Sequence, residues 1–308
     1  MQIYRHIDEY VQPQYPIVTV GTFDGVHIGH QMILERLADL AKEKEGEVVL
    51  LTFYPHPRKV LAQEAQALEM ITSLDDKISL MEHFGVKHMV IQPFTLDFSK
   101  MEYEEFVKNI LVEKLGVKTL VIGYDHQFGH QRKGNMKELE KLGPQLGFEV
   151  IEIPEQDIDA IAVSSTRIRK ALKQGEVAVA ANLLGYDYKL SGKVVKGKQL
   201  GRELGFPTAN IQCADPDQLV PANGIYAVMV EWKEQMLKGA LSIGHRPTFD
   251  NGERSIEVHI LGFDENIYGE SLTIHFRHYL RPELKFHSAE ELVTQMHKDK
   301  EQCYELLR

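Results

Sequence analysis

Short apolar runs alternate with stretches of helical spacing through the first half of the chain. The apolar runs predict strands at 18–23, 47–53, 87–94, 119–122 and 148–155. Apolar residues that recur every three or four positions predict helices over 33–41, 73–85, 102–116 and 135–147. We expect Ser73 to cap the second helix, and the last helix to break at Gly143 and Pro144. This alternation predicts an open, parallel, doubly wound sheet.

The pattern changes after Tyr186, where short strand-like runs are separated by turns rich in Gly, Pro and Asn. Such strands are expected at 224–232, 235–244, 255–263 and 271–280. They predict an antiparallel barrel or sandwich. A final helix over 288–307 has Ser288 as its N-cap and Glu291 in the capping-box position. The 308 residues are enough for two cores, and we predict domains at 1–186 and 187–308.

Charge and cysteine usage narrow the class of protein. The chain has 35 Lys and Arg against 45 Asp and Glu, a net charge of −10 that disfavours nucleic acid and anionic membranes as partners. Cys213 and Cys303 form no CxxC pair, so neither a disulfide framework nor a thiolate zinc site is indicated. The first residues lack an apolar signal region, and no run of 18 apolar residues follows. We expect a soluble, cytoplasmic protein without a membrane span.

The motif GTFDGVHIGH lies between the first strand and the first helix. Three glycines, Gly21, Gly25 and Gly29, punctuate the turn, and His27 and His30 follow it closely. A helix N-terminus behind such a turn favours an anion, above all a nucleotide phosphate. The imidazoles would stabilise charge at phosphorus, as nucleotidyl transfer requires. One alternative is an exposed turn; another is a zinc pair, but zinc histidines on a helix usually lie four apart, with an acid between them.

Other polar residues follow later strands of the predicted sheet and are expected at the same edge. They are His56, Asp125 with the loop to Asn135, and the segment SSTRIRKAL at 164–172. The serines and threonine of that segment suit a helix cap, and its arginines suit a phosphate, although an ordinary surface helix has the same features. His126 and His130 are expected to be solvated rather than catalytic.

The stretch KGKQLGRELGFPTAN is the most informative part of the second half. Its glycines and basic residues predict either a basic hairpin or a loop that cradles phosphate, and Thr208 and Asn210 offer oxygen ligands for Mg²⁺. Glu257 in EVHI is either a solvent-facing acid or a general base for a substrate hydroxyl. We discount His259, His275 and His278 as a metal site, because a spacing of three on a strand points side chains to opposite faces.

These motifs carry a resemblance to known families. GTFDGVHIGH and SSTRIR are similar to the signature motifs of the nucleotidylyltransferase superfamily. Together with GKQLGRELGFPTAN, GIYAV, SIGHRPTF, EVHILGF and LRPELKF, they resemble the bacterial bifunctional riboflavin kinase/FMN adenylyltransferases over nearly the whole chain. The resemblance implies a Rossmann-like FMN adenylyltransferase domain at 1–186. It also implies a riboflavin kinase domain at 187–308, built as a six-stranded antiparallel Greek-key barrel with a C-terminal helix.

For the second domain, the resemblance implies phosphorylation of riboflavin by ATP to give FMN. Glu257 matches the catalytic base, and Thr208 and Asn210 match the ligands of Mg²⁺ and phosphate. Arg281 is a candidate flavin contact. The implied ATP-binding residues are Gly197, Lys198, Gly201, Arg202, Pro207, Thr208 and Asn210.

For the first domain, the resemblance implies that the FMN phosphate attacks the α-phosphate of a second ATP, which gives FAD and pyrophosphate. His27 and His30 match the catalytic histidine pair, and Asp125 is a candidate flavin contact. The implied ATP and phosphate contacts are Gly21, Phe23, Asp24, Gly25, Gly29, Ser164, Ser165, Thr166 and Arg167. The expected partners are these small molecules, and the oligomeric state is left open.

The sequence departs from the family pattern at His126, Gln127, Asn135 and Gly262. None of these positions lies in the motifs that carry the chemistry, so both activities are expected. Two other hypotheses are a flavin-binding sensor that has lost one or both activities, and a transferase of the same superfamily with another phosphorylated acceptor. Intact Glu257 and His30 oppose the first, and a second domain that carries PTAN opposes the second.

Overall fold

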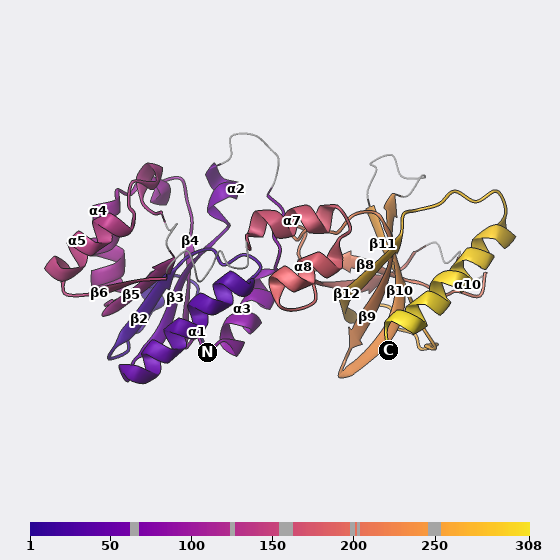
Figure 1. The fold of residues 1–308 in the computed structure, drawn as a ribbon, viewed down its shortest axis with the longest axis horizontal. Helices are drawn as coiled ribbons and strands as arrows, with labels where there is room; N and C mark the ends of the chain where they lie inside the picture. Colours follow the sequence, from indigo (N-terminus) through magenta and orange to yellow (C-terminus); the bar gives the residue numbers. More distant parts are fainter. Residues whose placement is uncertain (62–67, 124–126, 154–162, 198–200, 202–203, 246–253) are drawn as a thin grey trace. The chain divides into compact units, whose positions relative to one another are not determined.

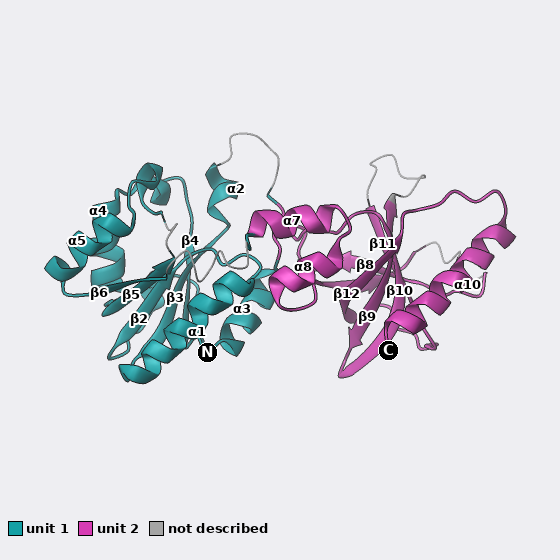
Figure 2. Cartoon of the chain, in the orientation of Figure 1, with its two compact units in different colours: residues 1–68, 72–164 teal, residues 69–71, 165–308 magenta. Residues whose placement is uncertain are grey.

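The structure is a computed structural model, and it describes residues 1–61, 68–123, 127–153, 163–197, 201, 204–245 and 254–308. The chain divides into two compact units, coloured separately in Figure 2. Unit 1 comprises residues 1–68 and 72–164, and unit 2 comprises residues 69–71 and 165–308. Helices α7 (Ser165–Lys173) and α8 (Val177–Leu184) therefore belong to the same unit as the second half of the chain. The predicted domain boundary between residues 186 and 187 stays a prediction.

Unit 1 is built on the parallel sheet that the apolar runs predict (Figure 1). Its strands are β1 (Gln2–Tyr4), β2 (Pro16–Val20), β3 (Glu47–Tyr54), β4 (His88–Pro93), β5 (Thr119–Gly123) and β6 (Glu149–Ile153). They lie in the order β1-β4-β3-β2-β5-β6, and every pair is parallel. The order reverses beside β2, which has β3 on one side and β5 on the other. This is the position at which open α/β sheets bind ligands.

The helices of unit 1 cover the sheet. They are α1 (Ile28–Glu43), α2 (Pro57–Leu61), α3 (Leu74–His83), α4 (Tyr103–Glu105) and α5 (Met136–Leu146). A π-helix over Phe106–Lys114 continues α4, and short 3₁₀ turns lie at Ile7–Glu9, Phe98–Lys100 and His130–Arg132. One core contains Leu34 and Leu37 of α1. A second core contains Leu111 of the π-helix and Leu139 of α5. Two separate cores confirm the doubly wound arrangement.

One predicted feature of α5 is wrong. The helix does not break at Gly143 and Pro144 but runs through both to Leu146. Pro144 has no N–H to donate to the carbonyl four residues earlier, so one intrahelical hydrogen bond is lost, yet the helix continues for two residues beyond it. The helix ends instead at Gly147, whose φ of 80° is left-handed and favours glycine. The predicted cap at Ser73 is confirmed, since its side chain accepts a hydrogen bond from the Asp76 amide at 3.1 Å.

Unit 2 is a closed antiparallel barrel with helices outside it. Its strands are β7 (Lys189–Val195), β8 (Ala209–Cys213), β9 (Gly224–Trp232), β10 (Gln235–His245), β11 (Arg254–Ile260) and β12 (Ser271–Arg281). The order β10-β11-β8-β7-β12-β9 places β12 beside β9, the first of three consecutive strands. That return of the fourth strand to the first is a Greek key. The barrel and its topology match the expectation.

In the part of unit 2 that the structure describes, the longer helices are α7 (Ser165–Lys173), α8 (Val177–Leu184) and α10 (Ala289–Leu306). The side chain of Ser288 accepts a hydrogen bond from the Glu291 amide at 3.2 Å, so the predicted N-cap of α10 is confirmed. The short segment 69–71 also belongs to this unit. The Met70 amide donates to the Asp217 carbonyl at 2.8 Å, and Arg169 Nε donates to the Glu69 carbonyl at 2.8 Å.

Candidate functional sites

The loop between β2 and α1 has a strained backbone conformation that must be stabilised by packing of its side chains. Phe23, Gly25 and Val26 have φ values of 46°, 86° and 36°, a region that only glycine adopts without strain. The side chains of Phe23 and Val26 are buried, at 4% and 0% exposure. Tertiary packing therefore stabilises the turn at the carboxyl end of the central strand.

The two histidines of the motif contact each other. His27 is the N-cap of α1, and its Nδ1 accepts a hydrogen bond from the His30 amide at 3.3 Å. The two rings stack in parallel, with centroids 3.6 Å apart and planes at 14°. Stacked rings do not direct their nitrogen atoms at one point, which is a geometric argument against a zinc pair.

His30 has the electrostatic character of a neutral imidazole. Burial holds its pKa well below the ordinary value, and the neighbouring His27 and Lys77 lower the pKa further. Its Nδ1 has no hydrogen-bond partner among the described residues. Burial of a polar atom without a hydrogen-bond partner costs free energy of folding, and a bound ligand that supplies the partner removes this cost. His30 thus offers a hydrogen-bonding group beside the N-terminus of α1, where phosphate is favoured.

Asp24 is directed into the protein. It is 1% exposed, and its carboxylate accepts a hydrogen bond from the Thr72 amide at 3.3 Å. The Thr72 hydroxyl in turn accepts from the Gly25 amide at 3.2 Å. Asp24 was predicted to contact phosphate, and in the structure its carboxylate helps to hold the loop through Thr72.

The other residues predicted for this site are distributed differently. Ser164 belongs to unit 1, whereas Ser165, Thr166 and Arg167 form the first turn of α7 in unit 2. Thr166 and Arg167 are exposed. Four of the predicted or departing positions, Asp125, His126, Lys198 and Arg202, lie outside the described residues.

Two of the departures from the family pattern have structural roles. Asn135 is the N-cap of α5, and its side chain accepts a hydrogen bond from the Glu138 amide at 3.3 Å. Gly262 follows β11 with a φ of 70°, which favours glycine. Gln127 is exposed. His130, which was expected to be solvated, is half-buried, and its Nδ1 lies 3.3 Å from the Ser99 carbonyl oxygen.

A row of aromatic rings near the carboxyl ends of β3 and β4 was not predicted. Phe53 contacts Phe94 and Phe98, with ring centroids 5.6 and 5.7 Å apart. Phe98 then contacts Phe106 at 6.3 Å. The signal in the sequence was the recurrence of phenylalanine after successive strands, but only the parallel sheet brings these rings together.

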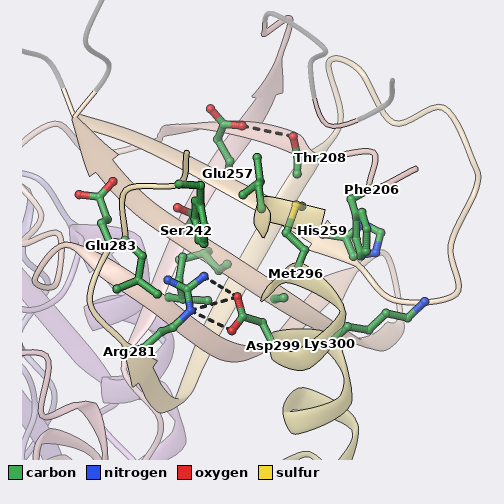
Figure 3. Close-up of a pocket in the computed structure, with 16 residues that line it drawn as sticks. Phe206, Thr208, Ser242, Glu257, His259, Arg281, Glu283, Met296, Asp299 and Lys300 are labelled. Carbon is green, nitrogen blue, oxygen red and sulfur yellow. Dashed lines mark hydrogen bonds and ion pairs between the residues drawn. The ribbon is translucent and has the colours of Figure 1, made fainter. Parts of the chain in front are cut away.

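Unit 2 contains a pocket of about 210 Å³ whose lining includes residues of strands β10 and β11 and of helix α10. Glu257 and Thr208 lie toward one end of the pocket, and Arg281 and Asp299 lie toward the other (Figure 3). The apolar part of the lining comes from Phe206, Ile225, Leu241, Leu284, Leu292 and Met296. A pocket with an apolar body and a few polar groups at its ends is typical of a small-molecule site.

The polar end of the pocket brings together residues of two strands and one loop. The Thr208 hydroxyl donates to the Glu257 carboxylate at 3.2 Å. Asn210 on β8 is the register partner of Glu257 on β11, and it is 6% exposed. A Cβ at Gly197 would overlap the side chain of Asn210, so any larger residue there would require Asn210 or the loop to move. Glu257 is half-buried and not a fully solvated acid.

The PTAN loop is held by two further contacts. The Nδ1 of His259 lies 2.8 Å from the Pro207 carbonyl oxygen, and because that oxygen only accepts, Nδ1 carries the proton. Burial lowers the pKa of His259. At Gly201, a Cβ would lie 2.3 Å from the Phe206 carbonyl oxygen. These contacts keep the loop close to β11.

At the other end, Arg281 is paired with a buried carboxylate that was not predicted from the sequence. Its Nη2 lies 2.6 Å from Asp299 Oδ2, and its Nε donates to Oδ1 at 2.9 Å. Asp299 is 5% exposed and also accepts from Gln295 at 2.9 Å. Asp299 and Cys303 are the buried residues of α10, four positions apart, and an acid on that face was the available signal. The flavin contact of Arg281 stays a prediction.

The fold and the two sites together define a class of protein. A parallel sheet with a histidine-bearing turn at its switch point, followed by a barrel with a Thr–Glu pair at an apolar pocket, indicates a two-domain transferase of phosphorylated compounds. Two family models match the chain in this order. The model described as FAD synthetase matches residues 11–167, and the model described as riboflavin kinase matches residues 184–307.

Relatives along nearly the whole chain identify the family. The bifunctional riboflavin kinase/FMN adenylyltransferase of Listeria monocytogenes is 40% identical over 92% of this chain and 90% of its own. The protein of that name from Haemophilus influenzae is 38% identical over 92% of each chain. That from Escherichia coli is 34% identical over 92% of this chain and 90% of its own. The chain therefore belongs to the family of bifunctional riboflavin kinase/FMN adenylyltransferases.

A solved structure agrees with the fold. The crystal structure of a protein from Streptococcus pneumoniae, described as a macrolide-efflux protein, has a TM-score of 0.88 to this chain at 31% identity, and 97% of each chain is covered. Among the described residues of the present chain, no helix is both long and apolar enough to cross a membrane.

Proposed function

We propose that unit 2 transfers the γ-phosphate of ATP to riboflavin, and that unit 1 transfers the adenylyl group of a second ATP to the resulting FMN. The observation that carries the proposal is the Thr208–Glu257 contact at the mouth of an apolar pocket, in a chain that also holds the stacked His27–His30 pair at a switch point. The order of the two matched families supports the same sequence of steps.

In the kinase step, the Glu257 carboxylate accepts the proton of the riboflavin 5′-hydroxyl. The hydroxyl oxygen forms a bond to the γ-phosphorus, while the bond from that phosphorus to the β,γ-bridging oxygen breaks and ADP leaves. The apolar lining of the pocket suits the flavin ring, and the Arg281–Asp299 pair adds a polar wall whose charges offset each other.

The oxygen-rich end of the pocket suits a magnesium ion. Hydroxyl and amide oxygens of Thr208 and Asn210 would be its protein ligands, with Glu257 close by, and these are the hard donors that Mg²⁺ prefers. When bound, the ion would neutralise charge on the phosphates of ATP. Gly197 and Gly201 allow the backbone to approach closely here, as a phosphate-cradling loop requires.

In the transferase step, an oxygen of the FMN phosphate attacks the α-phosphorus of ATP. The bond from the α-phosphorus to the α,β-bridging oxygen breaks, and pyrophosphate leaves. His27, His30 and the amides at the start of α1 would stabilise the charge on these phosphates. The aromatic row of Phe53, Phe94 and Phe98, whose rings meet edge-to-face or tilted, offers an apolar surface for the flavin ring of FMN.

A chromatographic assay of flavin products tests the function as a whole. The purified chain, incubated with riboflavin, ATP and Mg²⁺, is expected to accumulate FMN first and FAD afterwards. Absence of FMN would contradict the kinase assignment. Formation of FMN without FAD would contradict the transferase assignment. Tight flavin binding with unchanged ATP would instead support a sensor.

We further propose a cytoplasmic location. Cys213 and Cys303 are both free cysteines, as a reducing compartment favours. The proposed partners are the small molecules themselves, and the net charge of −10 disfavours nucleic acid.

A further inference from the structure

We infer that Lys77 is a positioning residue of the adenylyl-transfer site, and that its buried ammonium fixes the GTFDG loop by a hydrogen bond to the Thr22 carbonyl. Lys77 lies on α3 and is 4% exposed. Its Nζ donates to the Thr22 carbonyl oxygen at 2.8 Å. The inference rests on the proposed function of unit 1 and adds a residue outside the motif to its machinery.

The loop needs such an anchor because its backbone is strained on both sides of Asp24. Phe23, Gly25 and Val26 all have positive φ. Lys77 holds the carbonyl that precedes this stretch, and Thr72 holds Asp24 and the Gly25 amide. Lys77 on α3 and Thr72, just before the N-cap of α3, therefore hold the loop at Thr22, Asp24 and Gly25. His27 follows directly, so its place at the N-cap depends on this grip.

Burying a lysine ammonium costs free energy, so we infer that its charge has a role at this position. Burial lowers the pKa of Lys77, while the Asp24 carboxylate acts in the opposite direction. Asp24 itself is 1% exposed. A neutral donor such as glutamine could also bind a carbonyl, but it could not interact electrostatically with Asp24.

The charge of Lys77 also acts on His30. The titratable groups that influence His30 are His27 on the same turn and Lys77 on α3, and both lower its pKa. Asp24, on the loop, acts on Lys77 itself, since its carboxylate raises the pKa of the lysine and so favours the charged form. A neutral His30 keeps one ring nitrogen as an acceptor, and a protonated His30 has only donors. Lys77 thus holds the loop in position, and it adds to the effect of burial, which is the main cause of the low pKa of His30.

Two substitutions separate these effects. Lys77→Met keeps the length of the side chain but removes the hydrogen bond and the charge. Thr72→Val removes the acceptor of the Gly25 amide without removing a charge. Both are expected to lower kcat/KM of adenylyl transfer at least tenfold, and only Lys77→Met should raise the apparent pKa of the acid limb of the pH–rate profile. Lys42→Met, at an exposed position of α1 with 80% side-chain exposure, is the matched control.

Riboflavin kinase activity of the same preparations reports only that unit 2 has folded, so urea unfolding followed by circular dichroism is used to check that unit 1 of each variant is folded. Titration of His30 by NMR in the wild type and in Lys77→Met gives a readout that does not depend on turnover, and we expect a higher pKa in the variant. An unchanged His30 titration, or unchanged transfer in a variant with normal kinase activity, would overturn the inference. Wild-type chain that makes no FAD would overturn the proposed function instead, and the NMR titration would still decide the role of Lys77.

Discussion

The two sites of this chain are assembled in opposite ways. The transferase site of unit 1 is local, because the residues from Gly21 to His30 form one turn and the start of one helix. The kinase site of unit 2 is dispersed, because Thr208, Glu257 and Asp299 come from a loop, a strand and the C-terminal helix. A local site depends mainly on backbone conformation. A dispersed site depends on strand register and on pairs of side chains that are remote in sequence.

The largest expected effect concerns the dispersed site. Glu257→Gln keeps the size of the side chain but removes the base, and kcat of the kinase should fall about 10³-fold, within the range for general base catalysis. Conversion of supplied FMN to FAD should be unchanged. Glu234→Gln, at an exposed turn of the same barrel, is the matched control. Loss of both activities in Glu257→Gln would mean that the two sites are not separate.

The corresponding change in the local site is His30→Ala. It removes a group placed to bind phosphate, and adenylyl transfer should fall about 10²-fold, as when one stabilising donor is lost. With riboflavin as substrate, the product should be FMN and no FAD. His83→Ala, at an exposed position of α3, should behave as the wild type. Normal FAD formation by His30→Ala would remove the histidine pair from the mechanism.

A smaller effect is expected from Gly197→Ala. The new Cβ would lie 2.2 Å from the Asn210 amide nitrogen, so the loop or Asn210 must move. We expect KM for ATP in the kinase reaction to rise about tenfold, equivalent to about 1.4 kcal/mol of binding. Adenylyl transfer should be unaffected. A kinase with wild-type KM would show that Asn210 is not held against the loop during catalysis.

The smallest effect is a pH dependence of stability in unit 1. Burial holds the pKa of His30 low, whereas an unfolded histidine titrates near 6.5. Below that pH the unfolded chain binds a proton that the folded chain does not, so stability falls as pH falls, by about 1.4 kcal/mol per unit. Urea unfolding followed by circular dichroism between pH 7.5 and 5 measures this slope. It should be shallower in His30→Gln, and equal slopes would contradict the prediction.

The secondary structure around the histidine pair of the local site could be predicted from sequence. The strand, the glycine turn and the helix start all lie within one stretch, and their signals depend on neighbours a few positions away. The caps at Ser73 and Ser288 were predictable for the same reason. What could not be predicted was the environment of His30, since Lys77 lies on another helix and its proximity depends on the packing of α3.

The dispersed site was predictable only in part. PTAN and Glu257 were identified by motif, but the pairing of Arg281 with Asp299 was not, because it joins a strand end to a helix face. The continuous helix through Pro144 was also missed, because proline usually ends a helix, whereas here the helix continues to Leu146 despite the lost hydrogen bond.

By itself, the sequence determined the alternation of strands and helices, the two-part order of the chain and the residue types available for phosphate chemistry, because these follow from short-range periodicity and local backbone preferences. The tertiary structure alone decided which of these residues meet. It stacked His27 on His30, set Thr208 beside Glu257, and placed Lys77 under the loop. Such contacts depend on sheet order, barrel closure and helix packing, which arise from interactions between distant parts of the chain.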